Sequence, residues 1–422
     1  MDRSVSVVIN TYNRATSLRS TLQSLKRLSY STFEVIVVNG PSSDDTDRVL
    51  SEFAGTISVG RCDQVNLSVS RNIGLEMAAG EFVAFIDDDA IPYEYWLNDL
   101  VPHFDTSEVA GVGGFVFDHN GFDFQHCYRM MNRAGSGGVD IDREPDEYCY
   151  PGSPLTPYML GTNALFRRDL ALEFGGFDEE YEYYLEETDL CTRLLDAGYL
   201  LKQRSGGFVY HMRLASDRRN EHRVFVNWFS IIKNQVYYGI KNAIDGLGPE
   251  EIVAATRLRL LEIEDSLRAR VETGEISPAE IDRFRRDSPV AIELGAEHAA
   301  EPRHLMAPAK AVGKPFLPHP HIGNASRPTL CLTLSHHDVQ ITPEMRQYAE
   351  SLLQDGTIVH VLVRSASGEN RVTYEDGIWI HHLQLLTQDD SAAGWNMRAE
   401  AEILRLRRLY KIDRVEALNS LR

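Results

Sequence analysis

The stretch FVAFIDDD, residues 82–89, is the most informative part of this chain. An apolar run of strand character leads directly into three consecutive carboxylates. Carboxylates at the end of a buried strand cost free energy unless a cation or hydrogen bonds compensate them. Hard divalent cations prefer such oxygen ligands and can hold a diphosphate at the same time. The stretch therefore predicts a metal site, with a solvated acidic helix cap as the alternative.

The composition is that of a large globular protein. At 422 residues the chain exceeds one compact core, so we expect two or three domains. The 62 acidic and 43 basic residues give a net charge of −19, which argues against a nucleic-acid polymer as partner. A nucleotide is still compatible with this charge, because a bound metal reverses the local sign.

Three features indicate a cytoplasmic protein. The five cysteines are scattered without a CxxC pair, which is typical of reduced thiols. A strand begins at Val5, which leaves no room for a signal peptide. No apolar run reaches the ~18 residues that a membrane span needs, so any association with the inner face of a membrane would be peripheral.

Short apolar runs alternate with helical patterns in the first part of the chain. This alternation predicts an α/β fold with a Rossmann-like, mostly parallel sheet. Strands are expected at 5–9, 33–38, 57–59, 82–86 and 111–117. Helices are expected at 46–53 and 70–79 and around the apolar stripes of 18–25 and 190–195.

The pattern divides the chain into four parts. Residues 1–215 form the first α/β domain, and residues 216–287 form a helical extension. Residues 288–327, rich in Ala, Pro, Gly and His, are expected to be a linker. Residues 328–422 are expected to form a partial second α/β (Rossmann-like) segment.

Polar residues follow the expected strands at the points where ligands bind in an open α/β sheet. Each has a structural alternative as a turn former, a helix cap or a surface residue. Their coincidence at several strand ends predicts a binding site. The residues are Thr11, Asn13, Asn39, Ser42, Asp87, Asp88, Asp89 and His211.

Taken in order, the motifs resemble the family 2 glycosyltransferases of the GT-A fold over about residues 4–240. The motifs are VVINTYNR at 7–14, VVNGPSSD at 37–44, SRNIG at 70–74, DDD at 87–89, GTN at 161–163, GGFDE at 175–179, EETDL at 186–190 and His211. The resemblance implies inverting transfer of a sugar from a nucleotide-diphosphate donor to an acceptor hydroxyl. It leaves UDP, dTDP and GDP open as donor nucleotides, and it implies a glycan or lipid-linked acceptor in surface polysaccharide or glycoconjugate biosynthesis.

The resemblance also assigns roles around the donor. Asn39 stands where many family members carry an aspartate that faces the base, and an amide can both donate and accept there. The implied donor-binding residues are Thr11, Asn13, Asn39, Arg71, Asp87 and Asp88. Arg71 has a structural salt bridge as its alternative role.

The same resemblance implies that Asp87, Asp89 and His211 hold Mn²⁺ or Mg²⁺. An imidazole ligand suits Mn²⁺ better than Mg²⁺. The metal would stabilise the charge that develops on the leaving diphosphate.

The catalytic base is expected in the acidic first turn of a helix, where the helix dipole favours carboxylates. The resemblance points to Glu187, with Glu186 or Asp189 as substitutes. The family usually has an Asp in this pair, so the longer Glu side chain leaves the choice among the three residues open.

Residues 328–422 resemble the N-terminal half of a family 4 (GT-B) glycosyltransferase. Strands are expected at 329–334, 359–363 and 377–380, but a glycine-rich loop is replaced by SHHDV at 335–339. Either a truncated enzyme or a docking segment explains this part of the chain.

Two other functions are considered. A non-catalytic GT-A-like scaffold or binding protein is disfavoured by the acids at 87, 89 and 187 and by His211. A sugar nucleotidyltransferase would need a glycine-rich phosphate loop, and residues 11–14 contain no glycine. The oligomeric state is left open.

Overall fold

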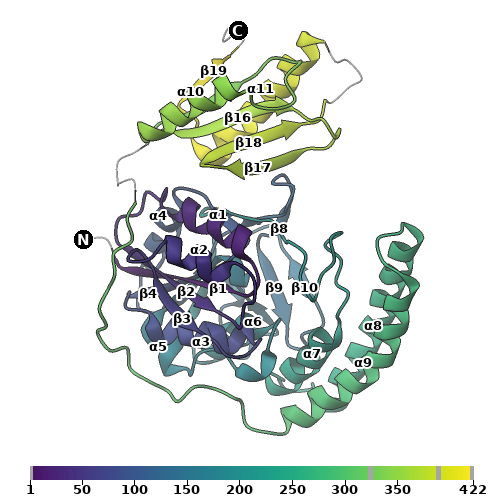
Figure 1. Ribbon diagram of the computed structural model, residues 1–422. Helices are drawn as coiled ribbons and strands as arrows, with labels where there is room; N and C mark the ends of the chain where they lie inside the picture. The colour runs from purple at the N-terminus through teal and green to yellow at the C-terminus, as the bar shows by residue number, and fades with distance from the viewer. Residues whose placement is uncertain (1–2, 322–326, 386–390, 419–422) are drawn as a thin grey trace.

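The computed structural model describes residues 3–321, 327–385 and 391–418 and has a mixed α/β architecture (Figure 1). The predicted linker and the predicted C-terminal segment each include residues outside these ranges. The helices are α1 Ala15–Leu25, α2 Thr46–Glu52, α3 Leu67–Met77, α4 Trp96–Leu100, α5 Arg168–Glu173, α6 Glu186–Asp196, α7 Phe229–Lys241, α8 Pro249–Glu272, α9 Pro278–Ala299, α10 Pro343–Gln354 and α11 Ala392–Tyr410.

The strands belong to four sheets, of which the largest has seven strands in the order β13-β6-β12-β4-β1-β2-β3. The strands are β1 Val5–Thr11, β2 Phe33–Asn39, β3 Ser58–Arg61, β4 Phe82–Asp87, β5 Ala90–Pro92, β6 Val109–Gly113, β7 Val116–Phe117, β8 Phe124–His126, β9 Arg129–Asn132, β10 Gly138–Asp140, β11 Leu155–Pro157, β12 Ala164–Arg167, β13 Leu200–Gln203, β14 Val209–His211, β15 Thr329–Thr333, β16 Ile358–Arg364, β17 Arg371–Glu375, β18 Ile378–Leu383 and β19 Arg414–Ala417.

The seven-stranded sheet is buried on both faces. Its strands pair in parallel, except that β12 is antiparallel to β4 and to β6. Successive residues of β1 enter opposite layers: Val7 packs in the core that contains Leu22 of α1, and Val8 packs in the core that contains Leu190 of α6. Burial of each such side chain stabilises the fold by about 2 kcal/mol. The predicted fold class, α/β with a mostly parallel sheet, is confirmed.

The strand register brings the predicted site residues to one edge. Thr11 pairs with Asn39, and Asn10 pairs with Asp87, so the ends of β1, β2 and β4 coincide. The polar residues that follow these strands therefore lie close together, as the sequence predicts for an open sheet.

A second sheet, in the order β5-β14-β7-β8, begins directly after the three carboxylates. The strand expected at 111–117 is divided, because β6 ends at Gly113 and β7 joins this second sheet. Strand β14 is antiparallel to β5, and His211 pairs with Ala90. This pairing brings His211 next to the acidic turn.

The helical extension is longer than predicted. Helix α9 continues to Ala299, so the linker boundary expected at 288 is wrong for the first part of that segment. Pro289 lies inside this helix, but Ala291 and Ile292 are buried and hold the helix together by packing. Gly295 permits this packing, because a Cβ there would collide with the carbonyl of Lys233 on α7.

Residues 301–321 form an extended strap that runs back along the first domain (Figure 1). The backbone amide of His319 donates to Phe33 O at 2.9 Å, and that of Leu317 donates to Glu34 Oε2 at 3.1 Å. The strap is therefore fixed to the first domain by hydrogen bonds.

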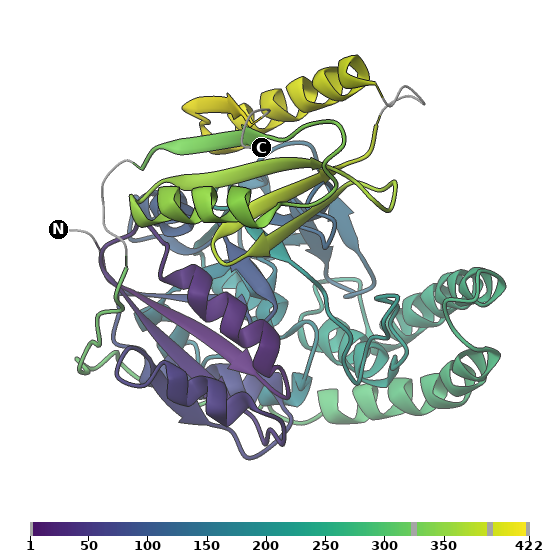
Figure 2. The same cartoon turned by 45° about the horizontal axis from the view of Figure 1, so that its top comes forward.

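The C-terminal segment forms a five-stranded sheet in the order β17-β18-β16-β15-β19. Figures 1 and 2 both place it against the side of the first domain that carries α1. Ile91 and Tyr210 of the second sheet share one hydrophobic core with Trp379 of β18. The Trp379 indole donates to Glu94 Oε1 at 3.1 Å, and its ring centroid is 4.7 Å from that of Tyr210. The two α/β units thus share a core.

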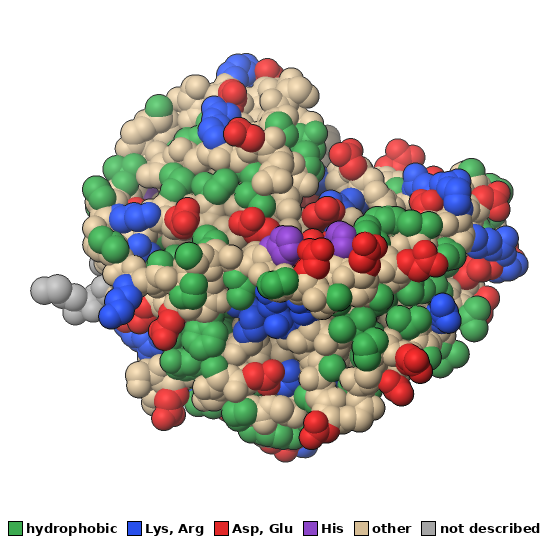
Figure 3. All heavy atoms as spheres, turned by 90° about the horizontal axis from the view of Figure 1, so that it is seen from below, with side chains coloured by type: hydrophobic (Ala, Val, Ile, Leu, Met, Phe, Trp, Pro, Cys, Tyr) green, Lys and Arg blue, Asp and Glu red, His purple; other side chains and the backbone are tan. Residues whose placement is uncertain are grey.

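The surface carries charges of both signs. On the face shown in Figure 3, basic, acidic and hydrophobic side chains are interspersed, and this face has no continuous basic stripe. Among the helices of residues 3–321, 327–385 and 391–418, none has the length and apolar character that a bilayer crossing requires.

We predict that the shared core makes both α/β units unfold together. Trp379→Ala removes a large buried ring and leaves Glu94 without its indole donor, so it should destabilise the chain by about 3–5 kcal/mol. Urea unfolding followed by far-UV circular dichroism measures this loss. The control Leu404→Ala removes a side chain that is 57% exposed, and it should change stability by less than about 0.5 kcal/mol. Two separate transitions in the unsubstituted protein would contradict a shared core.

Candidate active site

Asp87, Asp89 and His211 converge at the end of β4. His211 Nε2 lies 3.2 Å from Asp89 Oδ1 and 3.6 Å from Asp87 Oδ2. One ligand atom from each of the three residues lies within 4.8 Å of the others. Two carboxylate oxygens and one imidazole nitrogen are a donor set that suits Mn²⁺, and it also accommodates Mg²⁺.

The imidazole is oriented by a residue that the sequence did not single out. His211 Nδ1 lies 2.7 Å from Gln125 Oε1, and a hydrogen bond from Nδ1–H to this amide oxygen directs the Nε2 lone pair toward the carboxylates. Gln125 lies on the short strand β8, and no pattern in the sequence distinguishes it.

Asp89 is held by the segment that follows β14. Its Oδ2 accepts a hydrogen bond from Leu214 N at 2.8 Å, and Arg14 Nη1 lies 3.9 Å from the same oxygen. Burial opposes ionisation of Asp89, but His211 and the Leu214 amide outweigh it and lower the pKa of this carboxyl. Burial raises the pKa of Asp87, although His211 and Arg71 oppose this effect. A dication would compensate the buried Asp89 and the half-buried Asp87.

The middle carboxylate points away from this group. Thr11 Oγ1 donates to Asp88 Oδ2 at 2.6 Å, and both side chains are buried. Burial and the neighbouring Asp89 raise the pKa of Asp88 to about 8, so it is mainly protonated at neutral pH. Of the predicted donor-binding residues, Thr11 and Asp88 therefore bind each other.

Asn13 and Asn39 hold the loops after β1 and β2. Asn13 has φ 54°, a left-handed conformation that asparagine tolerates, and its Oδ1 accepts from Ser43 N at 2.8 Å. Asn39 donates to Asp47 Oδ1 and accepts from Ser42 Oγ, each at 2.8 Å. An open pocket of about 390 Å³ adjoins these loops and is lined in part by Asn13, Arg14, Asp44 and Leu214.

A buried pair of carboxylates opens helix α6. Glu186 Oε1 lies 2.6 Å from Arg71 Nη1, and both side chains are almost fully buried. Glu187 Oε2 is 4.0 Å from the same nitrogen and makes no hydrogen bond within the described part of the chain. Burial and the Glu186 carboxylate raise the pKa of Glu187 to about 8, against the effect of Arg71. Because its pKa is raised, Glu187 takes up a proton more readily than an ordinary carboxylate does.

Arg71 joins the carboxylate pair to the metal-ligand group. Its guanidinium interacts electrostatically with Glu186, Glu187 and Asp87, so the two acidic groups are neighbours. Gly161 is required beside it, because a Cβ at that position would collide with the guanidinium. Thr162 follows, and its Oγ1 accepts from Asp87 N at 3.2 Å. The predicted GTN motif therefore packs between both groups.

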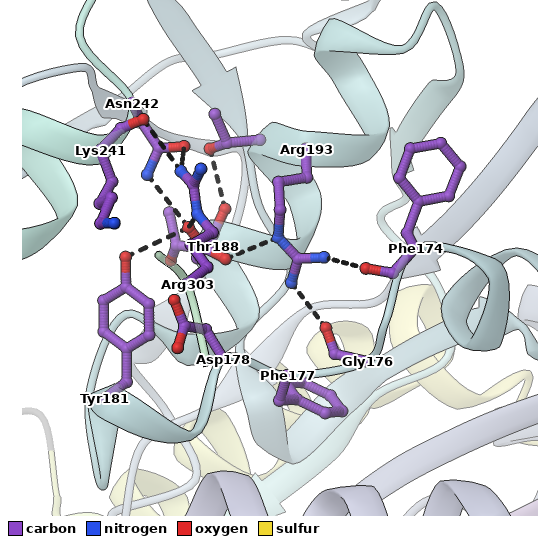
Figure 4. A network of polar contacts seen from close by, with 12 residues as sticks. Phe174, Gly176, Phe177, Asp178, Tyr181, Thr188, Arg193, Lys241, Asn242 and Arg303 are labelled. Carbon is purple, nitrogen blue, oxygen red and sulfur yellow. Dashed lines mark hydrogen bonds and ion pairs between the residues drawn. The ribbon is translucent and has the colours of Figure 1, made fainter. Parts of the chain in front are cut away.

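Asp189 belongs to a different network of polar contacts, which includes Tyr181, Arg193 and Arg303 (Figure 4). Its side chain is fully buried, and it pairs with Arg193 Nε at 2.7 Å and Arg303 Nε at 3.4 Å. Tyr181 also donates to it at 3.2 Å. Although burial opposes ionisation, the two arginines lower the pKa of Asp189. These contacts give Asp189 a structural role.

The sequence model described as Glycosyl transferase family 2 matches residues 6–174. The glucosyl-dolichyl phosphate glucuronosyltransferase of Haloferax volcanii is 30% identical over 210 residues, which are 46% of this chain and 63% of that protein. The pre-mycofactocin glycosyltransferase of Mycobacterium tuberculosis is 29% identical over 246 residues, which are 56% of this chain and 46% of that protein. The chain thus covers less than two thirds of either relative.

A solved structure is also similar. The mannosyltransferase PcManGT from Pyrobaculum calidifontis, in complex with GDP-Man and Mn²⁺, has a TM-score of 0.44 and 16% sequence identity. The similarity covers 71% of this chain and 88% of that one.

The family match ends at residue 174. The resemblance of residues 328–422 to a GT-B half is therefore untested and stays a prediction. For the first part of the chain, the match of residues 6–174 to the glycosyltransferase family 2 model supports the expected family 2 resemblance.

Proposed function

We propose that this chain is a metal-dependent inverting glycosyltransferase that uses a nucleotide-diphosphate sugar. One observation carries the proposal: the ligand group of Asp87, Asp89 and His211 lies beside the Arg71-linked pair of Glu186 and Glu187. Inverting transfer needs both a site for the leaving diphosphate and a base for the acceptor hydroxyl. The metal-ligand group would serve the leaving diphosphate, and the neighbouring pair of glutamates would supply the base.

Asp87, Asp89 and His211 would hold Mn²⁺ or Mg²⁺, which neutralises charge on the departing diphosphate. The loops around Asn13 and Asn39 would hold the nucleoside, with their side chains fixing the backbone that contacts it. This arrangement keeps the donor at the carboxyl ends of the strands.

Glu187 would act as the base. Its free Oε2 accepts the proton of the acceptor hydroxyl while the hydroxyl oxygen attacks the anomeric carbon and the bond to the diphosphate breaks. Glu186 forms an ion pair with Arg71, and the Glu186 carboxylate raises the pKa of Glu187. The ion pairs of Asp189 with Arg193 and Arg303 support Glu187 over Asp189 as the base.

The relatives' names support a glycan or lipid-linked acceptor in glycoconjugate or surface polysaccharide assembly, since one acts on a glucosyl-dolichyl phosphate and another is a chondroitin synthase. UDP, dTDP and GDP sugars are the donors to screen. Incubation with Mn²⁺ and this panel should reveal slow donor hydrolysis. Failure of every donor to turn over would count against the transferase.

We predict that Asp89→Asn weakens Mn²⁺ binding and lowers kcat/KM for donor hydrolysis by at least about 100-fold, because one anionic ligand is lost. Electron paramagnetic resonance of free Mn²⁺ measures the affinity, and chelation by EDTA should abolish the hydrolysis of the unsubstituted protein. The matched control Asp63→Asn removes an exposed carboxylate and should change neither quantity. Unaltered Mn²⁺ affinity in Asp89→Asn would refute this metal site.

Glu187→Gln should lower kcat for transfer by about 10²–10⁴-fold, because the amide keeps the shape but cannot take a proton. Donor binding, measured by calorimetry with Mn²⁺ and the nucleotide diphosphate, should stay within about twofold. Glu182→Gln is the control, since it neutralises an exposed acid in the same loop. Full activity of Glu187→Gln would assign the base elsewhere.

The pH dependence follows from the raised pKa of Glu187. The rate should increase with pH as this carboxyl loses its proton around pH 8. Glu186→Gln removes a neighbouring negative charge and frees Arg71, and both changes lower the pKa of Glu187. The rising limb of the kcat/KM profile should therefore move to lower pH, and a move to higher pH would contradict the assignment.

A further inference from the structure

The loop before the carboxylate pair has an uncommon backbone conformation. Glu182, Tyr184 and Leu185 have φ values of 47°, 78° and 73°, which place three non-glycine residues in the left-handed region. Bulky side chains rarely adopt this region, and doing so costs free energy. Such a conformation persists only where surrounding groups impose it.

Asn234 of helix α7 supplies this constraint. Its side chain is fully buried, and Nδ2 donates to Tyr183 O at 2.6 Å and Tyr184 O at 3.1 Å. The same Nδ2 contacts Tyr181 O, so one amide group serves three carbonyls of the loop. The Oδ1 atom has no hydrogen-bond partner in the described ranges, so the donor end fixes this side chain.

Neighbouring residues anchor the start of the same loop. Lys233 Nζ donates to Glu180 O at 2.9 Å and to Glu180 Oε1 at 2.7 Å. His298 of α9 lies 2.6 Å from that carboxylate through Nδ1. Lys233 in turn packs against Gly295. Hydrogen bonds from the helical extension thus hold the loop at positions from Glu180 to Tyr184.

The conformation of Leu185 sets the direction in which α6 begins. Leu185 is the residue before the helix, and Glu186 and Glu187 are its first two residues. A change of Leu185 to an ordinary negative φ would turn the start of the helix and carry both carboxylates away from Arg71. A displacement of about 1 Å at a reacting group costs about 10²-fold in rate.

We propose that Asn234 is a positioning residue that holds the strained 182–185 loop and thereby sets Glu187 against its substrate. The inference rests on the proposed function, because it takes Glu187 as the base. Asn234 lies outside residues 6–174, the part of the chain that matches the family. The helical extension then contributes to catalysis through a single buried amide.

The test compares Asn234→Leu with Gln235→Leu. Gln235 is the next residue of α7, it is also buried, and its Nε2 donates to Thr256 Oγ1 at 3.1 Å, away from the loop. Both substitutions replace a buried carboxamide by the same apolar side chain. Asn234→Ser, which keeps one hydrogen-bond donor, is the fallback if Asn234→Leu does not fold.

We expect hydrogen exchange of the amides in residues 180–189 to be faster in Asn234→Leu and unchanged in Gln235→Leu. We also expect kcat for transfer to fall about 10²-fold in Asn234→Leu. The KM for the nucleotide sugar and the Mn²⁺ affinity should stay within about twofold, because the donor site is not touched. A smaller change of the same kind is expected for Asn234→Ser.

Equal exchange of residues 180–189 in the two leucine variants would overturn the inference. A rise in KM with unchanged kcat would overturn it as well. If the unsubstituted protein turns over no nucleotide sugar, the proposed function fails. Faster exchange confined to the Asn234 variants would in that case still support the loop-holding role.

Discussion

The geometry of the candidate active site depends on one constraint, the repulsion among the carboxylates at one edge of the sheet. Asp89, Glu186 and Glu187 are buried and Asp87 is half-buried beside them, so each needs a compensating group. Arg71 pairs with Glu186 and interacts electrostatically with Asp87, and His211 lies 3.2 Å from Asp89. The position of Arg71 also explains the glycine at 161, because the Arg71 guanidinium occupies the space that a side chain at 161 would fill.

Much of the first domain could be predicted from its sequence, because buried parallel strands read as apolar runs and polar residues mark their ends. The meeting of His211 with Asp89 was also foreseen, and strand pairing brings it about. Gln125 and Asn234 were not found, since their roles come from contacts between distant segments. The end of α9 was missed because packing against α7 outweighs the cost of Pro289.

The first turn of α6 shows how one short segment serves two purposes. Its successive residues point to different sides of the helix, so Glu187 lies near Arg71 and Asp189 faces Arg193 and Arg303. The second network ties the helix to the strap through Arg303, whereas Glu187 Oε2 has no hydrogen-bond partner among the described residues. Carboxylates of nearly the same sequence position thus differ in pKa because their surroundings differ.

The core shared by Tyr210 and Trp379 also has a consequence for synthesis on the ribosome. The outer face of the paired strands β5 and β14 is complete only after β18 and α11 have been translated. Until then the side chains of Ile91, Phe117 and Tyr210 would be exposed to solvent. Nascent chains with exposed apolar side chains bind chaperones or aggregate. Maturation of the amino-terminal half would therefore lag behind its own translation by the time needed to make the residues from the end of β14 to the end of α11.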